Sequence, residues 1–177
     1  MKLKSTKADA DKRFQKLSLL AASLLCTVMF GLMATREAKA TLGAGVTAQP
    51  MAVGGLPEAI RTKLKADTGF ESGVAVSDIA VVKFTIAPGG YFGWHRHGGP
   101  VWVVVQEGTL TLYDPDVAGC ARTYTPGSVF LDSGDHVHNA RNEGTVPVVV
   151  YGTFMLPEGA ALRVDAPDPG TCVLPPL

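Results

Sequence analysis

The sequence is short of charge, aromatic residues and cysteine. Charged residues make up 18% of its 177 residues, aromatic residues make up 7%, and there are three cysteines. Because Glu and Lys are not abundant, a coiled coil or a long helix is not expected, and Val-rich runs with low charge argue against disorder. No Ser-His-Asp signature and no phosphate-binding loop is present. The chain instead holds 20 glycines and 12 prolines, which predict one domain of short elements and many turns.

The charges are unevenly distributed along the chain. Residues 1–40 contain eight Lys/Arg and three Asp/Glu, whereas residues 41–177 contain eight and thirteen. The body is therefore mildly acidic and has no basic stripe. Nucleic-acid binding depends on neutralising phosphates, so the sequence predicts no nucleic-acid partner.

The first forty residues have the pattern of a secretory signal. Basic residues precede the apolar run Leu17–Ala34, and small residues follow at Ala38 and Ala40. This pattern predicts a signal peptide over residues 1–40, cleavage after Ala40, a secreted or periplasmic protein and no membrane association after cleavage. The alternative is an uncleaved membrane anchor, because a run of about 18 residues is at the lower limit for spanning. Cys26 lies within the run and is lost if the signal is cleaved.

The mature chain keeps two cysteines, Cys120 and Cys172. In an oxidising compartment such a pair predicts one disulfide. On the chain-entropy account, closing a loop of this size contributes about 3–4 kcal/mol. Two free buried thiols are the alternative, and a metal role is disfavoured because the cysteines lack CxxC spacing.

The mature chain is expected to have three parts. Residues 41–73 form a lead-in with a short helix over 56–65, because Leu56, Ile60 and Leu64 recur every four residues. Residues 74–155 contain short segments of period two, separated by glycine-containing turns such as Glu107-Gly108. This spacing predicts an all-β sandwich or barrel. Residues 156–177 are Pro-rich and are expected to pack on the barrel as a tail.

All four histidines fall in two clusters, His95 with His97 and His136 with His138. On an extended segment, His-x-His places both imidazoles on one face, within reach of one ion. A third histidine from another strand completes three nitrogens on one side of the ion and leaves positions open for water or substrate. Imidazole suits iron, zinc and manganese among other metals. Histidines without any metal are the alternative interpretation.

These clusters resemble the motifs of the cupin superfamily. Gly89-x5-His95-x-His97-x3-Val101-x6-Gly108 is similar to the first cupin motif, and His138-x3-Asn142 is similar to the end of the second. The resemblance implies a single cupin-type β-barrel (a double-stranded β-helix, or jelly roll), often dimeric, with a metal near one end. The second motif departs from the pattern, because its proline is absent and Gly134 lies one residue further from the histidine than expected.

A second departure concerns the ligands. The usual carboxylate ligand of the family falls at Val101, which cannot bind metal, and Glu107 lies at the hairpin turn. The expected ligands are therefore His95, His97 and His138, with His136 as an alternative ligand or a residue behind the ligands. Such a site has no anionic ligand, so its metal keeps more positive charge and should attract anionic substrates. Val101, Val103, Val105 and Tyr151 are expected to wall the pocket.

Cupins with three histidine ligands include dioxygenases that act on thiols, diketones and gentisate-type rings. The resemblance therefore suggests one divalent metal per domain, with Fe(II) favoured and Zn or Mn also compatible, and a small chelating substrate. Two other functions remain open. One is a metal-dependent lyase, isomerase or hydrolase that does not use O2. The other is a non-catalytic periplasmic module that binds a small ligand or a metal.

Overall fold

The computed structural model describes residues 43–61, 63–65 and 71–176. The predicted signal peptide and its cleavage site lie outside these residues. Within them, all regular secondary structure is β, and no helix long and apolar enough to cross a membrane is found. The strands are β1 Ala44–Arg61, β2 Leu64–Lys65, β3 Glu71–Ser72, β4 Ala75–Tyr91, β5 His95–Arg96, β6 Val101–Glu107, β7 Leu110–Tyr113, β8 Ala121–Tyr124, β9 Val129–Asp132, β10 Asn139–Arg141, β11 Val148–Leu156 and β12 Val164–Asp165.

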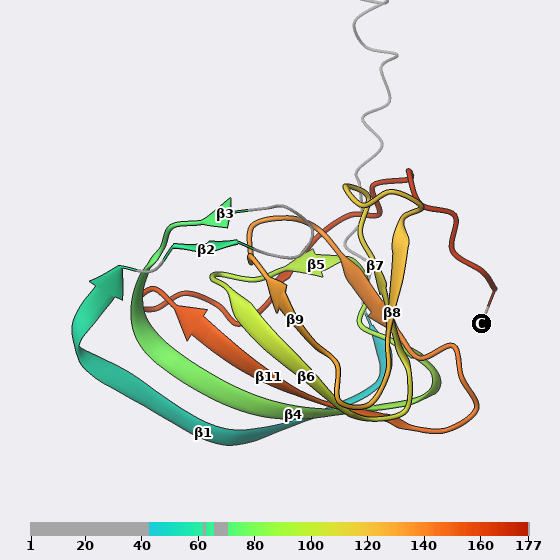
Figure 1. Ribbon diagram of the computed structural model, residues 1–177, viewed down its shortest axis with the longest axis horizontal. Helices are drawn as coiled ribbons and strands as arrows, with labels where there is room; N and C mark the ends of the chain where they lie inside the picture. The colour runs from blue at the N-terminus through green and yellow to red at the C-terminus, as the bar shows by residue number, and fades with distance from the viewer. Residues whose placement is uncertain (1–42, 62, 66–70, 177) are drawn as a thin grey trace, which may run out of the picture. The chain divides into compact units, whose positions relative to one another are not determined.

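The main sheet has eight strands and curls into a nearly closed barrel (Figure 1). Its order is β8-β7-β10-β4-β11-β6-β9, and β1 pairs with β4 outside this path. The two end strands, β8 and β9, follow one another along the chain. The turn between them is bonded to β6, because the Val105 amide donates to the Ser128 carbonyl at 3.0 Å and the Gly127 amide donates to the Val105 carbonyl at 2.9 Å. The predicted all-β barrel is confirmed.

The core follows from the period-two pattern of the strands. On β11, Val148, Val150 and Phe154 face inward and are almost fully buried. They meet inward residues of the neighbouring strands, such as Ile86 on β4 and Val105 on β6, in two adjoining clusters. Burying each such side chain contributes about 1.5–3 kcal/mol, so alternation sets which face of each strand turns inward.

The predicted hairpin at Glu107-Gly108 joins β6 to β7. Gly108 has a positive φ of 71°, and a Cβ there would lie 2.6 Å from the carbonyl oxygen of Pro147. The turn therefore requires glycine, because a side chain would be strained and would clash. Glu107 is exposed at this turn, away from the histidine clusters.

The helix predicted over residues 56–65 is wrong where the structure describes the segment. Leu56–Arg61 belongs to β1, and Leu64–Lys65 is β2. β1 pairs antiparallel with β4, from Ala44 opposite Tyr91 to Arg61 opposite Ala75. A helix of about ten residues is only marginally stable without tertiary packing. The predicted apolar stripe finds no such packing, since Ile60 is 52% exposed, whereas the edge of β4 supplies backbone partners.

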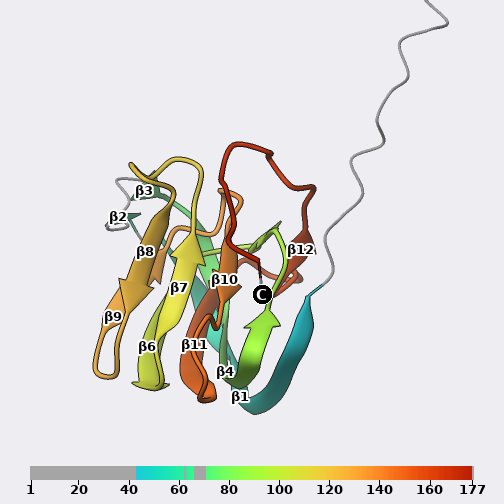
Figure 2. The same cartoon turned by 90° about the vertical axis from the view of Figure 1, so that its right-hand side faces the viewer.

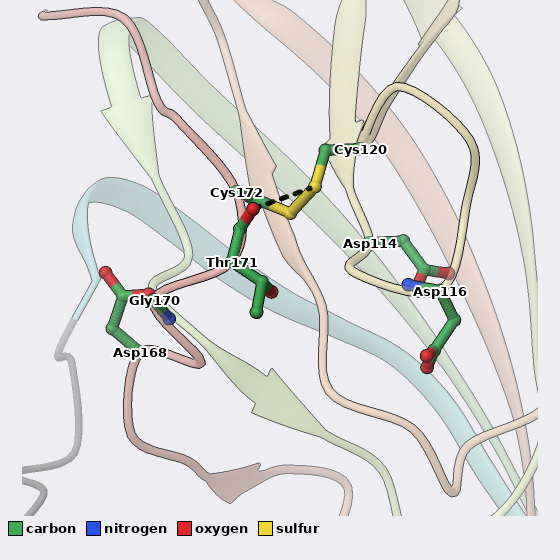
Figure 3. The surroundings of a disulfide bond; sticks show 7 residues. All are labelled: Asp114, Asp116, Cys120, Asp168, Gly170, Thr171 and Cys172. Atoms are coloured by element: carbon green, nitrogen blue, oxygen red, sulfur yellow. Dashed lines mark hydrogen bonds between the residues drawn. A yellow bond between two sulfur atoms is a disulfide. The ribbon is translucent and has the colours of Figure 1, made fainter.

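The C-terminal segment lies against the outside of the barrel. β12 pairs with β5, with Val164 opposite Arg96 and Asp165 opposite His95. Further along, Cys172 forms the predicted disulfide with Cys120, with their Cα atoms 5.6 Å apart (Figure 3). Cys172 also packs with buried Trp94 and Tyr113. In Figure 2 this segment passes in front of β10. The tail thus contacts two parts of the barrel that are distant in sequence.

Candidate metal centre

Two histidines of the first cluster and one of the second converge at one end of the barrel. His95 and His138 form a β-bridge, each donating its backbone N–H to the other's carbonyl at 2.9 Å. His97 follows two residues after His95. Ring centroids lie 4.4 Å apart for His95 and His138, 4.9 Å for His95 and His97, and 5.0 Å for His97 and His138. One ring nitrogen of each lies within 4.8 Å of the others.

The other ring nitrogen of each histidine faces an oxygen acceptor. Nδ1 of His95 lies 2.8 Å from the carbonyl oxygen of Gly93, and Nδ1 of His97 lies 2.6 Å from that of Leu162. Nδ1 of His138 lies 3.0 Å from Oδ2 of Asp132. Carbonyl and carboxylate oxygens only accept, so each Nδ1 carries the proton and each Nε2 keeps its lone pair. Such outer contacts are typical of metal-binding histidines, and this donor set fits a divalent transition metal.

The environment keeps the imidazoles of His95 and His97 neutral. Burial lowers the pKa of His95 well below its usual value, and the neighbouring His138 and His97 lower it further. Burial and His138 lower the pKa of His97 to about 4. Neutral imidazole is the form that binds metal, so His95 and His97 can bind a metal at neutral pH without losing protons.

Asp132 is the functional candidate that sequence reasoning missed. It ends β9, directly opposite Val101 on β6, and its side chain is buried. Burial by itself would raise the pKa of Asp132, but His138 and His97 outweigh this and lower it below the usual range. The carboxylate is therefore ionised next to the site. The signal in the sequence was an Asp closing the apolar strand segment Val129–Leu131.

The position of Asp132 changes one expectation. The absence of a carboxylate ligand at Val101 predicted a metal with more uncompensated positive charge. Asp132 places a negative charge one hydrogen bond away, behind His138. A carboxylate in this position raises the basicity of the histidine and orients its ring. Asp132 thus supplies the negative charge that the three histidines lack, from the Nδ1 side of His138.

His136 does not join the other three histidines. Its Nδ1 lies 3.2 Å from Oδ2 of buried Asp114, and its ring centroid lies 5.8 Å from that of His138. Asp114, Asp116 and His136 form a separate group of potential ligands. The difference arises because His136 lies in the turn before β10, whereas His138 is bridged to His95.

Behind the three histidines, the barrel contains a small cavity of about 50 Å³. Its wall is mainly aliphatic and aromatic and includes Phe84, Phe154 and two of the expected residues, Val101 and Val103. Val105 does not line it and packs in the core cluster instead. Tyr151 does not line it either, because its neighbours Val150 and Gly152 occupy the inward positions of β11.

A wider cavity of about 260 Å³ lies on the other side of His97. It is polar and is lined by Arg96, Gly99, Ser133, Gly134 and Asp135 among others. Gly134 has φ 93°, and a Cβ there would lie 2.3 Å from the carbonyl oxygen of Gly99. This glycine lets the loop before His138 approach the loop after His97. The backbone amide of His97 donates to the Gly134 carbonyl at 2.9 Å.

The sequence matches the family described as "Cupin domain" over residues 82–155. This part of the chain is therefore similar to cupin domains. The match runs from within β4 to within β11 and contains all three converging histidines, Val101 and Asp132. No curated protein matches the chain.

Solved structures similar to this chain include three with named proteins. The Cupin_2 domain of an XRE family transcriptional regulator from Enterobacter cloacae is 20% identical, with 64% of this chain and 99% of that chain covered and a TM-score of 0.43. The polyketide cyclase RemF from Streptomyces resistomycificus is 15% identical, with 71% and 80% covered and a TM-score of 0.47. A mutant oxalate decarboxylase from Bacillus subtilis is 26% identical, with 49% and 23% covered and a TM-score of 0.42.

Proposed function

We propose that this protein is a secreted cupin that holds one divalent metal through Nε2 of His95, His97 and His138. We propose further that the metal is Fe(II) and that the protein is a dioxygenase of a small chelating substrate. Fe(II) with three neutral nitrogen ligands supplies open coordination positions and one-electron chemistry with O2. Zn and Mn are compatible with the same nitrogens, so metal identity is the first point to test.

The observation that carries the proposal is the cavity behind the histidines. At about 50 Å³ it has room for one or two water-sized molecules, since a water takes about 30 Å³ in the liquid. Its wall is largely apolar, with Phe84, Phe92 and Phe154 close to the rings. An apolar diatomic molecule matches this space in size and polarity, whereas an organic substrate is too large. The cavity therefore supports a role for O2 on this side of the metal.

The organic substrate then approaches from the polar cavity on the other side of His97. That cavity has about 260 Å³, enough for a small metabolite. Arg96 is exposed there and can pair with a carboxylate or enolate oxygen of a substrate. Asp132 supports binding from behind, because its contact with His138 holds that ring in place.

One observation favours a second candidate function, a metal-binding module without turnover. Among the described residues lining the small cavity, only Asp132 and the three histidines are titratable. Asp132 is already engaged by His138 and the Gly134 amide, so no free general acid or base is among the described residues that line the small cavity. An enzyme that needs proton transfer but not O2, such as a lyase or isomerase, is the least supported of the three functions.

The metal content of protein purified from its own host tests the centre, with His95→Ala as the control. Iron at one equivalent, absent from the variant, supports the proposal. Zinc or manganese would favour chemistry without O2, and no metal would overturn all metal-dependent functions. Next, the Fe(II)-loaded protein is supplied with diketones, catechols and thiols while O2 is monitored. Turnover without O2 would contradict the dioxygenase, and tight binding without any product would favour the binding module.

The disulfide supports the proposed secretion, because such bonds persist mainly in oxidising compartments. Intact mass spectrometry of the exported protein tests the cleavage site. A mature chain starting at Thr41 is the expected result, and an uncut chain in the membrane fraction would contradict it.

A further inference from the structure

A separate cavity lies on the outside of the barrel, between β10 and the C-terminal tail. It has a volume of about 280 Å³ and is lined by Trp94, Asn139, Arg141, Asp168, Leu174 and Pro175, among others. None of the four histidines is among its described lining residues. Trp94 precedes His95, whose ring lines the cavity behind the metal site instead. The outer cavity is therefore distinct from the metal centre.

Two polar side chains of β10 are buried on this outer face. The alternation of the strand directs Ala140 into the barrel core, so Asn139 and Arg141 lie on the opposite face. Each is nevertheless only 4% exposed. The tail covers them, and Arg141 Nη2 donates to the carbonyl oxygen of Pro175 at 3.0 Å. The disulfide at Cys172 ties this tail to the loop after β7 (Figures 2 and 3).

Both side chains keep an unused polar atom. Asn139 Oδ1 and Arg141 Nε are buried and have no hydrogen-bond partner among the residues that the structure describes. A buried polar atom without a partner costs about 1–3 kcal/mol, more for a charged group, so native proteins rarely leave one. The first atom is an acceptor and the second is a cationic donor. A ligand that carries both a hydrogen-bond donor and an anionic hydrogen-bond acceptor would satisfy both atoms.

The charges around the cavity match this requirement. Arg141 contributes positive charge from the barrel, and Glu143 offsets it only through Nη1, at 3.7 Å. Asp168 contributes negative charge from the tail. One of its oxygens accepts from the Gly170 amide at 2.8 Å, and its other oxygen stays available. Trp94 and Leu174 add apolar wall.

We propose that this cavity binds a small zwitterion of the amino-acid class. The carboxylate of the ligand accepts from Arg141 Nε, its ammonium group donates to Asn139 Oδ1 and to Asp168, and its side chain lies against Trp94. A volume of 280 Å³ equals about nine liquid waters, which suits a small or medium amino acid. The site does not depend on the proposed metal centre.

Three matched probes test the proposal: L-valine, isovalerate, which lacks the ammonium group, and isobutylamine, which lacks the carboxylate. Trp94 is buried in the cavity wall, and the other tryptophan, Trp102, is 39% exposed on β6. A Trp102→Phe background of the mature, disulfide-bonded protein therefore makes Trp94 emission a specific reporter. We expect a saturable change with L-valine and at least tenfold weaker binding of both single-charge probes. Equal responses to the three probes, or no saturable response, would overturn the proposal.

Variants in the same background locate the site. Asn139→Leu and Arg141→Met remove the unpaired atoms, and Asp168→Asn removes the exposed carboxylate without touching buried structure. Each is expected to weaken L-valine binding at least tenfold, whereas Glu158→Gln, an exposed carboxylate elsewhere on the C-terminal segment, leaves it unchanged. If Arg141→Met does not fold, the affinity of Asp168→Asn for L-valine still tests the proposal. Unchanged affinity in Asp168→Asn and Asn139→Leu would show that the zwitterion binds elsewhere.

Discussion

Oδ2 of Asp132 lies 3.0 Å from Nδ1 of His138, and Asp132 is paired across the sheet with Val101. Val101 occupies the position at which the cupin motif has its carboxylate ligand. This chain instead has its carboxylate on the neighbouring strand, where it contacts His138 and not the position that a metal would take. The His138 ring thereby gains a charged partner. This partner would strengthen the binding of a metal by His138 without occupying a coordination position of that metal.

Removing this charge should weaken metal binding. Asp132→Asn keeps the shape of the side chain but loses the anionic acceptor, so we expect the affinity for a divalent metal to fall by about 10–100-fold. Titration against a chromophoric chelator measures the change. Asp135→Asn, an exposed carboxylate on the same loop, should leave the affinity within about twofold. Equal affinities of the Asp132 variant and the native protein would show that the contact is only structural.

The two histidines of the second cluster should behave differently. His138→Ala removes one of the three converging nitrogens and should abolish stoichiometric metal binding. His136→Ala should retain one metal per chain, because His136 is paired with Asp114 and stands apart from the three. Elemental analysis after dialysis distinguishes the variants. Loss of metal in His136→Ala, with circular dichroism of a folded barrel, would make His136 a ligand instead.

The metal-free protein should lose stability as pH falls from about 6.5 toward 4. In the unfolded chain, histidine takes up a proton near pH 6.5. In the fold, burial keeps the pKa of His95 well below that value and lowers the pKa of His97 to about 4. The unfolded state therefore binds more protons in this window, and the free energy of unfolding rises with pH.

Of two other shifted groups, Asp132 leaves this slope unchanged, whereas His136 opposes it between pH 6 and 7. The lowered pKa of Asp132 acts only below its usual range, where protonation would remove its stabilising contact. Burial opposes a raised pKa at His136, yet Asp114 raises it, so its contribution is complete below pH 6.5 and is lost at higher pH. Urea unfolding at pH 7, 6 and 5 checks the prediction. The slope should be smaller in His97→Gln, and a flat profile for the native protein would contradict the argument.

The disulfide should stabilise the fold mainly through the unfolded state. Cys120 and Cys172 are 52 residues apart in sequence, for which the chain-entropy account gives about 4 kcal/mol. The double variant Cys120→Ser/Cys172→Ser should unfold at a clearly lower denaturant concentration. Because Cys172 packs with Trp94, the tryptophan emission of the double variant should also shift to longer wavelength. An unchanged midpoint would show that tail contacts alone hold the segment.

Strand positions and turns were predictable from local sequence. The alternation in residues 78–87 and 146–154 and the Glu107-Gly108 turn each specify a strand face or a reversal within a few residues. The helix prediction at Leu56–Arg61 failed because a four-residue apolar repeat cannot show that a neighbouring strand edge is open for pairing. Backbone pairing over a long register outweighed the weak helical preference of a short segment.

The all-β class, the His-x-His spacing and the lack of a carboxylate at Val101 could be read from the sequence, because all three are local properties. The folded structure was needed to show which histidine of the second cluster meets the first cluster, where a compensating charge lies, and what covers β10. His138 meets His95 through a bridge, Asp132 reaches it from β9, and the tail buries Arg141. Each of these contacts joins residues of different strands or of the tail. Their distances depend on how the sheet closes, a property that no short stretch of sequence contains.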